Sequence, residues 1–315
     1  MNVFPLKSDL EEAYARVTPH VHQTPILTSS LLDEMTEAAL FFKCENFQRM
    51  GAFKMRGAIH AILQLSGEQK QAGVITHSSG NFGQAVSLAA RTLGVKAYVV
   101  MPKNAPQVKK EAVASYGGII TECDSNIAER EATASRIVDE KGATFLHPSN
   151  NTDVILGNAT VAMELLRKKP ELDIIISPVG GGGLLAGSAL AAHYFGNDCE
   201  SIAGEPMAAD DAYRSLQSGK IETNKSTTTI ADGLRTHLGD KNFPIIKSLV
   251  SEIIRVEESE IVDSLKLICE RMKIVVEPSS AVPFAAILKQ SQTFKGKKVG
   301  IILSGGNVDL SNLPF

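Results

Sequence analysis

At 315 residues with 43% hydrophobic content, the chain exceeds the size at which one hydrophobic core usually divides in two. Its 32 basic and 35 acidic residues give a net charge of −3, which favours neither nucleic acid nor a membrane as a partner. The expected partner is a small molecule. The four cysteines lack C-x-x-C spacing, which argues against a disulfide framework or a zinc site. No apolar run approaches the roughly 20 residues of a membrane helix, and the first residues resemble no signal peptide; we expect a cytoplasmic protein.

Short apolar or β-branched runs alternate with Ala-rich amphipathic stretches, a pattern typical of an α/β fold with a parallel sheet covered on both faces. The expected strands are residues 40–42, 74–76, 97–101, 118–122, 143–146, 174–177, 201–204, 253–256 and 299–303. We expect two domains: a larger one from residues 1–72 and 150–315, and a smaller inserted one from residues 73–149.

The earliest candidate for chemistry is Lys54, within residues 51–57 (GAFKMRG) at the start of a helical stretch. A lysine in an apolar setting loses proton affinity and becomes suited to Schiff-base chemistry. From this segment alone, a lysine with a solvated tip at a helix N-terminus is the simpler interpretation.

Three expected strands end in polar or glycine-rich turns, at residues 77–81 (HSSGN), 180–183 (GGGG) and 304–307 (SGGN). In open α/β sheets ligands bind beyond the carboxyl ends of the strands, so the three turns are expected to meet at one crevice. The first of them also suits an ordinary turn with a helix N-cap at Asn81.

The run of four glycines, residues 180–183, is the most informative stretch of the chain. A strand that ends in glycines and turns into a helix presents free backbone N–H groups and the positive end of the helix dipole, which together suit a phosphate. Gly181, Gly183 and Ala186 also satisfy G-x-G-x-x-A, and Glu205 follows the next strand, so a nicotinamide dinucleotide is a rival ligand. A phosphate site together with Lys54 favours pyridoxal phosphate.

Taken together, five segments resemble serine racemase and the serine/threonine dehydratases of pyridoxal-phosphate fold type II: residues 51–57 (GAFKMRG), 76–81 (THSSGN), 178–187 (PVGGGGLLAG), 229–233 (TIADG) and 303–310 (LSGGNVDL). The resemblance covers nearly the whole chain. It implies two open, twisted α/β domains of the tryptophan synthase β type, with the cofactor between them. It also implies a homodimer.

The resemblance assigns the cofactor contacts. It implies that Lys54, beside Phe53, forms the Schiff base with pyridoxal phosphate. It also implies that Ser304 makes a hydrogen bond with the pyridine nitrogen. It further implies that Asn81 contacts the 3′-oxygen, that Gly233 lies at the cofactor, and that the phosphate is bound by backbone amides of Gly180, Gly181, Gly182, Gly183 and Leu184.

The resemblance also implies how substrate is bound. Ser78, Ser79, Gly80 and Asn81 are expected to bind its carboxylate, and Ser79 is expected to be the acid/base group on the cofactor face opposite Lys54. Related dehydratases often have alanine at the position of Ser79. Arg130 is expected to reach the substrate side chain, although a solvated helix arginine explains it equally well.

A divalent cation is implied by residues 204–211 (GEPMAADD). The carboxylates of Glu205 and Asp211 and the carbonyl of Ala209 are the expected ligands, and such oxygen donors favour Mg²⁺, Ca²⁺ or Mn²⁺ over zinc. Without the resemblance, Asp210 and Asp211 would more often form a helix N-cap.

These expectations predict a pyridoxal-phosphate-dependent serine racemase that also acts as a serine/threonine dehydratase on small hydroxy amino acids. The alternative within the family is a threonine or L-threo-3-hydroxyaspartate dehydratase without significant racemisation, because polar Ser149 and Asn150 suit a β-carboxylate. Outside it, a nicotinamide-dependent oxidoreductase and a non-catalytic regulatory protein remain as alternatives.

Overall fold

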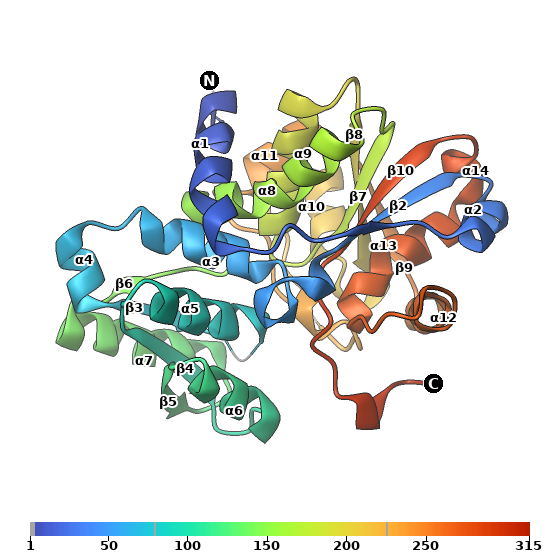
Figure 1. Cartoon of the computed structure of the whole chain (residues 1–315). Helices are drawn as coiled ribbons and strands as arrows, with labels where there is room; N and C mark the ends of the chain where they lie inside the picture. Colours follow the sequence, from blue (N-terminus) through green and yellow to red (C-terminus); the bar gives the residue numbers. More distant parts are fainter. Residues whose placement is uncertain (1–3, 79, 225) are drawn as a thin grey trace.

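The computed structural model describes residues 4–78, 80–224 and 226–315, and it contains two β-sheets. The larger sheet has the strand order β1-β2-β10-β7-β8-β9 and occupies the right-hand side of Figure 1. Its strands are β1 (Ile26–Leu27), β2 (Ala39–Cys44), β7 (Ile174–Pro178), β8 (Glu200–Pro206), β9 (Val250–Val256) and β10 (Lys298–Leu303). All neighbours in this sheet are parallel except β1 and β2.

The smaller sheet has the order β5-β4-β3-β6 and lies at the lower left of Figure 1. Its strands are β3 (Val74–His77), β4 (Ala97–Pro102), β5 (Ile119–Cys123) and β6 (Thr144–Phe145), and all of them are parallel. These four strands fall within the predicted inserted domain, residues 73–149. The division into two domains, as units that move separately, stays a prediction.

The nine expected strands are present, and the α/β fold class is confirmed. The structure adds β1, which pairs antiparallel with β2 through Ile26 and Leu27. A two-residue strand has too few positions to show alternation, so the sequence pattern did not reveal it. The larger sheet is therefore mixed, where a wholly parallel one was expected.

Helices cover both sheets (Figure 1). The α-helices are α1 (Lys7–Val17), α2 (Ser30–Thr36), α3 (Lys54–Leu63), α4 (Gly67–Ala72), α5 (Asn81–Thr92), α6 (Gln107–Ser115), α7 (Ile127–Lys141), α8 (Thr152–Lys168), α9 (Gly183–Phe195), α10 (Asp211–Ser218), α11 (Phe243–Leu249), α12 (Glu258–Leu267), α13 (Pro278–Lys289) and α14 (Ser291–Phe294). Shorter helical turns are η1 (Thr18–His20), η2 (Glu45–Phe47), η3 (Arg49–Gly51), η4 (Met207–Ala209), η5 (Asp232–Leu234), η6 (Ile268–Met272) and η7 (Leu310–Asn312).

Burial explains why the central elements form where they do. The strand β7 is buried along its whole length, as expected for a β-branched strand covered on both faces. Helix α8 begins where the Asn151 side chain accepts a hydrogen bond from the Val154 amide at 3.0 Å, an N-cap. Helix α3 shares a core cluster with α5 and β3, to which Ile59, Val86 and Val74 contribute. Val154 of α8 belongs to the same cluster, so α3 packs on α8 as well as on the smaller sheet.

None of the helices in the described part of the chain combines the length and the apolar character needed to cross a membrane. The four cysteines are free thiols, of which Cys44 and Cys123 are buried.

Candidate functional site

Lys54 is the first residue of α3, and the residue as a whole is half-buried. The chain reaches it through Met50 and Gly51, whose φ angles of 53° and 74° form a tight left-handed turn. Lys54 Nζ donates to the carbonyl of Pro148 at 2.8 Å and lies 5.6 Å from the centroid of the Phe82 ring. Burial lowers the pKa of Lys54 to about 8, against a smaller opposing effect of the Glu277 charge. A fraction of the amine is therefore neutral, as a nucleophile or base must be.

The glycine run forms the turn between β7 and α9, and all four glycines are buried. Gly182 has a φ of +80°, and a Cβ there would lie 2.6 Å from Leu238 Cδ2. Gly180 packs equally closely, because its Cβ would lie 2.6 Å from Leu234 Cα. Such a loop exposes backbone amides at a helix N-terminus, which is an anion-binding arrangement.

Asn242 fixes this loop in place. Its side-chain amide donates to the carbonyls of Gly181 at 2.8 Å and Ser149 at 3.1 Å, and its oxygen accepts from the Gly239 amide at 3.0 Å. The side chain is fully buried, so these bonds are not weakened by competing water. Ser149, after β6, is thereby held against the glycine run.

Asn81 is the first residue of α5 and joins three segments. Its amide donates to both carboxylate oxygens of Glu277, at 2.9 and 3.0 Å, and its oxygen accepts from Asn307 Nδ2 at 2.9 Å. Asn307 also donates to the carbonyl of Met50 at 2.9 Å, just before Lys54. Burial raises the pKa of Glu277 to about 7.

Ser304 follows β10 and is 3% exposed. Its hydroxyl lies 3.0 Å from the hydroxyl of Ser280, and its carbonyl accepts from the Phe53 amide at 2.9 Å. Gly233, in η5, donates from its backbone amide to Ser279 Oγ at 3.1 Å and borders Gly180. The structure therefore brings the segments of Lys54, Asn81, the glycine run, Gly233 and Ser304 together at the place where the three strand-end turns predicted a crevice.

The turn after β3 is described only in part. Ser78 is half-buried and its hydroxyl accepts from the Gly80 amide at 3.3 Å. Ser79, the expected second acid/base group, lies outside the described residues. Arg130, on α7, is close enough to His77 at the end of β3 for its charge to add to the burial that lowers the pKa of His77. Arg130 thus lies beside this turn.

The expected cation ligands meet at the end of β8. Glu205 is fully buried and accepts from the amides of Ala212 at 2.9 Å and Tyr213 at 2.8 Å. Asp211, also fully buried, accepts from Asn224 Nδ2 at 2.6 Å and from the Leu238 amide at 3.2 Å.

Burial raises the pKa of both carboxyl groups, and the Asp211 charge adds to the effect on Glu205. Two adjacent buried carboxylates suit a hard cation, to which Ala209, buried in η4, would add its carbonyl. Among the described residues no group of three or more acidic, histidine or cysteine side chains is placed to hold a metal, so such a cation would depend on that carbonyl and on water.

The family model for pyridoxal-phosphate dependent enzymes matches residues 17–305. The chain belongs to this family. A beta-hydroxyaspartate dehydratase from Paracoccus denitrificans is 47% identical over 311 residues, 99% of each chain. A serine racemase from Dictyostelium discoideum is 48% identical over 309 residues, 97% of this chain and 95% of the relative. The structure of maize serine racemase matches with a TM-score of 0.94 at 48% identity, over 96% of this chain and 94% of that one.

This pyridoxal-phosphate enzyme has fold type II, as the five sequence segments predicted. The residues of the site fit the cofactor: an amine of lowered pKa at Lys54, a glycine cradle for a phosphate, and the hydroxyl of Ser304. Family membership favours this cofactor over a dinucleotide for the glycine run.

Four residues of the site were missed from the sequence of this pyridoxal-phosphate enzyme: Glu277, Asn307, Asn242 and His147. His147 precedes Pro148, and its Nδ1 accepts from the amides of Ser149 at 3.2 Å and Asn150 at 2.8 Å. Burial lowers the pKa of His147 to about 4, so the ring is neutral at physiological pH. Asn307 lies in the quoted segment 303–310; no local pattern marks the other three.

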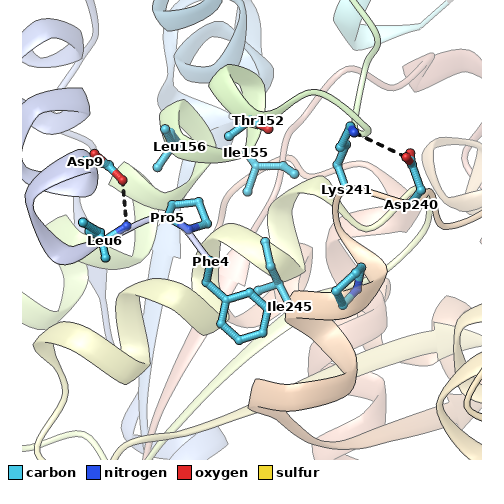
Figure 2. Close-up of a pocket in the computed structure, with 11 residues that line it drawn as sticks. Phe4, Pro5, Leu6, Asp9, Thr152, Ile155, Leu156, Asp240, Lys241 and Ile245 are labelled. Atoms are coloured by element: carbon cyan, nitrogen blue, oxygen red, sulfur yellow. Dashed lines mark hydrogen bonds and ion pairs between the residues drawn. The ribbon is translucent and has the colours of Figure 1, made fainter. Parts of the chain in front are cut away.

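A cavity of about 440 Å³ lies apart from Lys54, between the N-terminal segment, the first turn of α8 and the start of α11 (Figure 2). None of the residues expected in the site lines it. Asn150 faces this side: its amide donates to Asp240 at 2.8 Å and its oxygen accepts from the Lys241 amide at 2.8 Å. Both polar atoms of Asn150 thus have partners within the chain, and the expectation that it suits a substrate carboxylate stays a prediction.

Proposed function

We propose that this enzyme racemises serine and also eliminates water from small β-hydroxy amino acids, giving a 2-oxo acid and ammonia. The observation behind the proposal is the Lys54 amine, held by the Pro148 carbonyl at 2.8 Å beside a glycine cradle and given a pKa of about 8. Two relatives support it. The one from Dictyostelium discoideum is named a serine racemase, and the one from Paracoccus denitrificans is named a beta-hydroxyaspartate dehydratase.

Pyridoxal phosphate, when bound, supplies an electron sink that acidifies the α-proton of an attached amino acid. The residues of this chain then have separate tasks. The amides of the glycine run would bind the phosphate, Ser304 would offer a hydroxyl to the ring nitrogen, and Asn81 would contact the cofactor through its side chain. A hydroxyl there would not keep the ring nitrogen protonated as a carboxylate partner would, so the electron sink would be weaker, which suits elimination or quick reprotonation.

Lys54 removes and returns the α-proton on one face of the substrate. Its Nζ lies among the rings of Phe53 and Phe82, at 4.9 and 5.6 Å from their centroids, an environment that keeps part of the amine neutral. Loss of the β-hydroxyl after proton removal gives elimination. Return of a proton to the other face, for which we propose Ser79, gives the opposite enantiomer.

A second candidate is a dehydratase specific for a β-hydroxy dicarboxylic amino acid, such as L-threo-3-hydroxyaspartate. Within the described residues, the buried Nε of Arg130 has no hydrogen-bond partner, and its charge lies near His77. A buried guanidinium group gains from a carboxylate partner, so Arg130 is the residue we propose for a substrate β-carboxylate.

One experiment separates these functions: chiral product analysis and 2-oxo acid assay over L-serine, D-serine, L-threonine and L-threo-3-hydroxyaspartate. Borohydride reduction is expected to link the cofactor covalently to Lys54, and Lys54→Ala should abolish both activities.

Ser79→Ala should keep elimination from L-substrates and lose inversion. Inversion by Ser79→Ala at the parent rate would contradict the two-face mechanism, and a parent without inversion would leave only the dehydratase.

We further propose Mg²⁺, Ca²⁺ or Mn²⁺ at Glu205, Asp211 and Ala209, a cytoplasmic location and a homodimer. The buried carboxylates support the cation. The sequence resemblance supports the homodimer, and light scattering of the purified protein tests it. The cytoplasmic location rests on the sequence expectation alone.

A further inference from the structure

Four fully buried charged side chains form one cluster at the start of α3: Lys43 of β2, Glu45 of η2, Arg56 of α3 and Glu164 of α8. Each side chain is at most 1% exposed. We call these four residues the Arg56 network. None of them has a part in the chemistry described above.

Arg56 is the centre of the network and binds both carboxylates. Its Nε and Nη2 donate to Glu45 at 2.8 Å each, and its Nη1 and Nη2 donate to Glu164 at 2.8 and 2.9 Å. Lys43 completes the set, with Nζ 2.7 Å from Glu164 and 2.9 Å from the Thr24 carbonyl. The planar guanidinium group donates two hydrogen bonds to each of the two carboxylates, a fixed geometry that an ammonium group does not have.

Burying four charges in a protein core is energetically unfavourable. Buried ion pairs often stabilise a protein no more than apolar residues of the same volume, because four charges must lose their water. The two positive and two negative charges also sum to zero, so the network exerts little net field at Lys54. Its particular property is a fixed geometry.

The network reaches the start of α3 through Arg56. Phe53, the N-cap, gives no side-chain hydrogen bond to the helix, so the usual device that fixes a helix start is missing. One substitute is the Phe53 amide, which donates to the Ser304 carbonyl at 2.9 Å. The other is Arg56, two residues after Lys54, whose side chain extends into the interior while Lys54 reaches Pro148.

The neighbouring contacts extend this anchor to the rest of the site. Gly57 packs so closely on α8 that a Cβ there would lie 2.8 Å from the Val154 carbonyl. Thr24 donates to Glu45 at 2.6 Å and Thr160 accepts from Arg56 at 3.3 Å. The first turn of α3 is thus fixed against η2 and α8 at the level of Lys54.

We propose that Arg56 is a positioning residue, which holds the first turn of α3 so that the Lys54 amine stays shielded from water and correctly placed for the cofactor. The inference rests on the role of Lys54 in the proposed function. Misplacing a reacting group by about 1 Å costs on the order of 100-fold in rate, so a rigid backbone at this position matters.

Arg56→Lys tests the proposal, because it keeps the positive charge but removes the planar group that binds both carboxylates. In the apo-protein, the pKa of the Lys54 amine, measured by pH-dependent labelling and mass spectrometry, should rise from about 8 toward 10.5 as water gains access. In the holoenzyme, kcat should fall about tenfold or more while KM changes little. Thr24→Val, which keeps all four charges and loosens Glu45, should give smaller changes of the same sign, and it serves if Arg56→Lys does not fold.

Phe294→Leu is the control for stability, because Phe294 is fully buried in the cluster beside β2 and outside the network. It should lower Tm and leave the pKa of Lys54 unchanged. If the folded network variants lower Tm but leave that pKa and kcat unchanged, the network only stabilises the fold and the proposal is wrong. A parent protein without cofactor on Lys54 would instead contradict the proposed function, and labelling of the apo-protein would still report on the network.

Discussion

At the scale of single residues, the site combines groups whose environments shift them toward neutrality. Burial brings the pKa of Lys54 down to about 8 and that of Glu277 up to about 7. Asn81 connects Glu277 to the crevice and Asn307 connects Asn81 to the turn before Lys54. The Glu277 charge also acts on Lys54, where it partly opposes the effect of burial on the pKa.

Glu277 should make the apo-protein less stable as pH rises. Its folded pKa of about 7 exceeds its ordinary value of 4.5, so between these pH values the unfolded chain loses a proton that the folded protein retains. The free energy of unfolding should therefore fall across this window, and Glu277→Gln should reduce that slope. Denaturant unfolding from pH 4.5 to 7 measures it.

The matched control is Glu257→Gln, because Glu257 is also an N-cap glutamate but is exposed. It should keep the parent slope. Some slope should remain in Glu277→Gln, since burial also raises the pKa of Glu205. An unchanged slope in Glu277→Gln would show that Glu277 titrates normally.

At the scale of elements, two parts of the site are a strand, a short turn and a helix: β3 and α5 at Asn81, and β7 and α9 at the glycine run. The glycine run between β7 and α9 is the clearest case, because Leu234, Leu238 and Asn242 surround it so closely that a methyl group has no room. The backbone amides then remain free for an anion.

Gly182→Ala should destabilise the protein and weaken pyridoxal-phosphate binding. Its φ of +80° costs an alanine about 1–2 kcal/mol, and the new Cβ would also lie 2.6 Å from Leu238 Cδ2. Gly94→Ala is the control, because Gly94 has a φ of +69° but open space around it. It should show the backbone cost alone and normal cofactor affinity. Equal cofactor affinity in the two variants, by absorbance titration, would argue against the cradle.

At the scale of the whole molecule, the two sheets share the crevice, and contacts between distant segments hold it together. Lys109 of α6 pairs with Asp232 of η5 at 2.6 Å, joining the helix beside the smaller sheet to the turn that borders the glycine run. The end of β8 and the start of α10 contribute the buried pair Glu205 and Asp211. A cation there would stabilise the larger sheet as a whole.

Mg²⁺ should raise Tm of the parent and should do so much less in Asp211→Asn. An ion that binds only the folded state adds RT ln(1 + [L]/Kd), about 2.7 kcal/mol at a hundredfold excess over Kd. Asp210→Asn is the control, since Asp210 is already paired with Arg214 at 2.7 Å and Arg255 at 3.0 Å; it should lower Tm equally with and without Mg²⁺. Identical Tm values of the parent in Mg²⁺ and in chelator would exclude the site.

The sequence by itself determined the class of fold and the cofactor family, because both follow from local patterns. Apolar runs marked nine strands, and the glycine run and the segment around Lys54 marked where phosphate and amine belong, since each depends on residue types that are adjacent in the chain. The antiparallel β1 was too short for such a pattern.

Only the tertiary structure decided which distant groups meet. Glu277 reaches Asn81 across 196 residues of chain, Asn242 reaches the glycine run across 61, and Arg56 meets Glu164 across 108. It also decided that Asn150 donates a hydrogen bond to Asp240, 90 residues further along the chain. Burial and neighbouring charges set the pKa of a group, and both arise from packing between segments, which the order of residues along the chain does not specify.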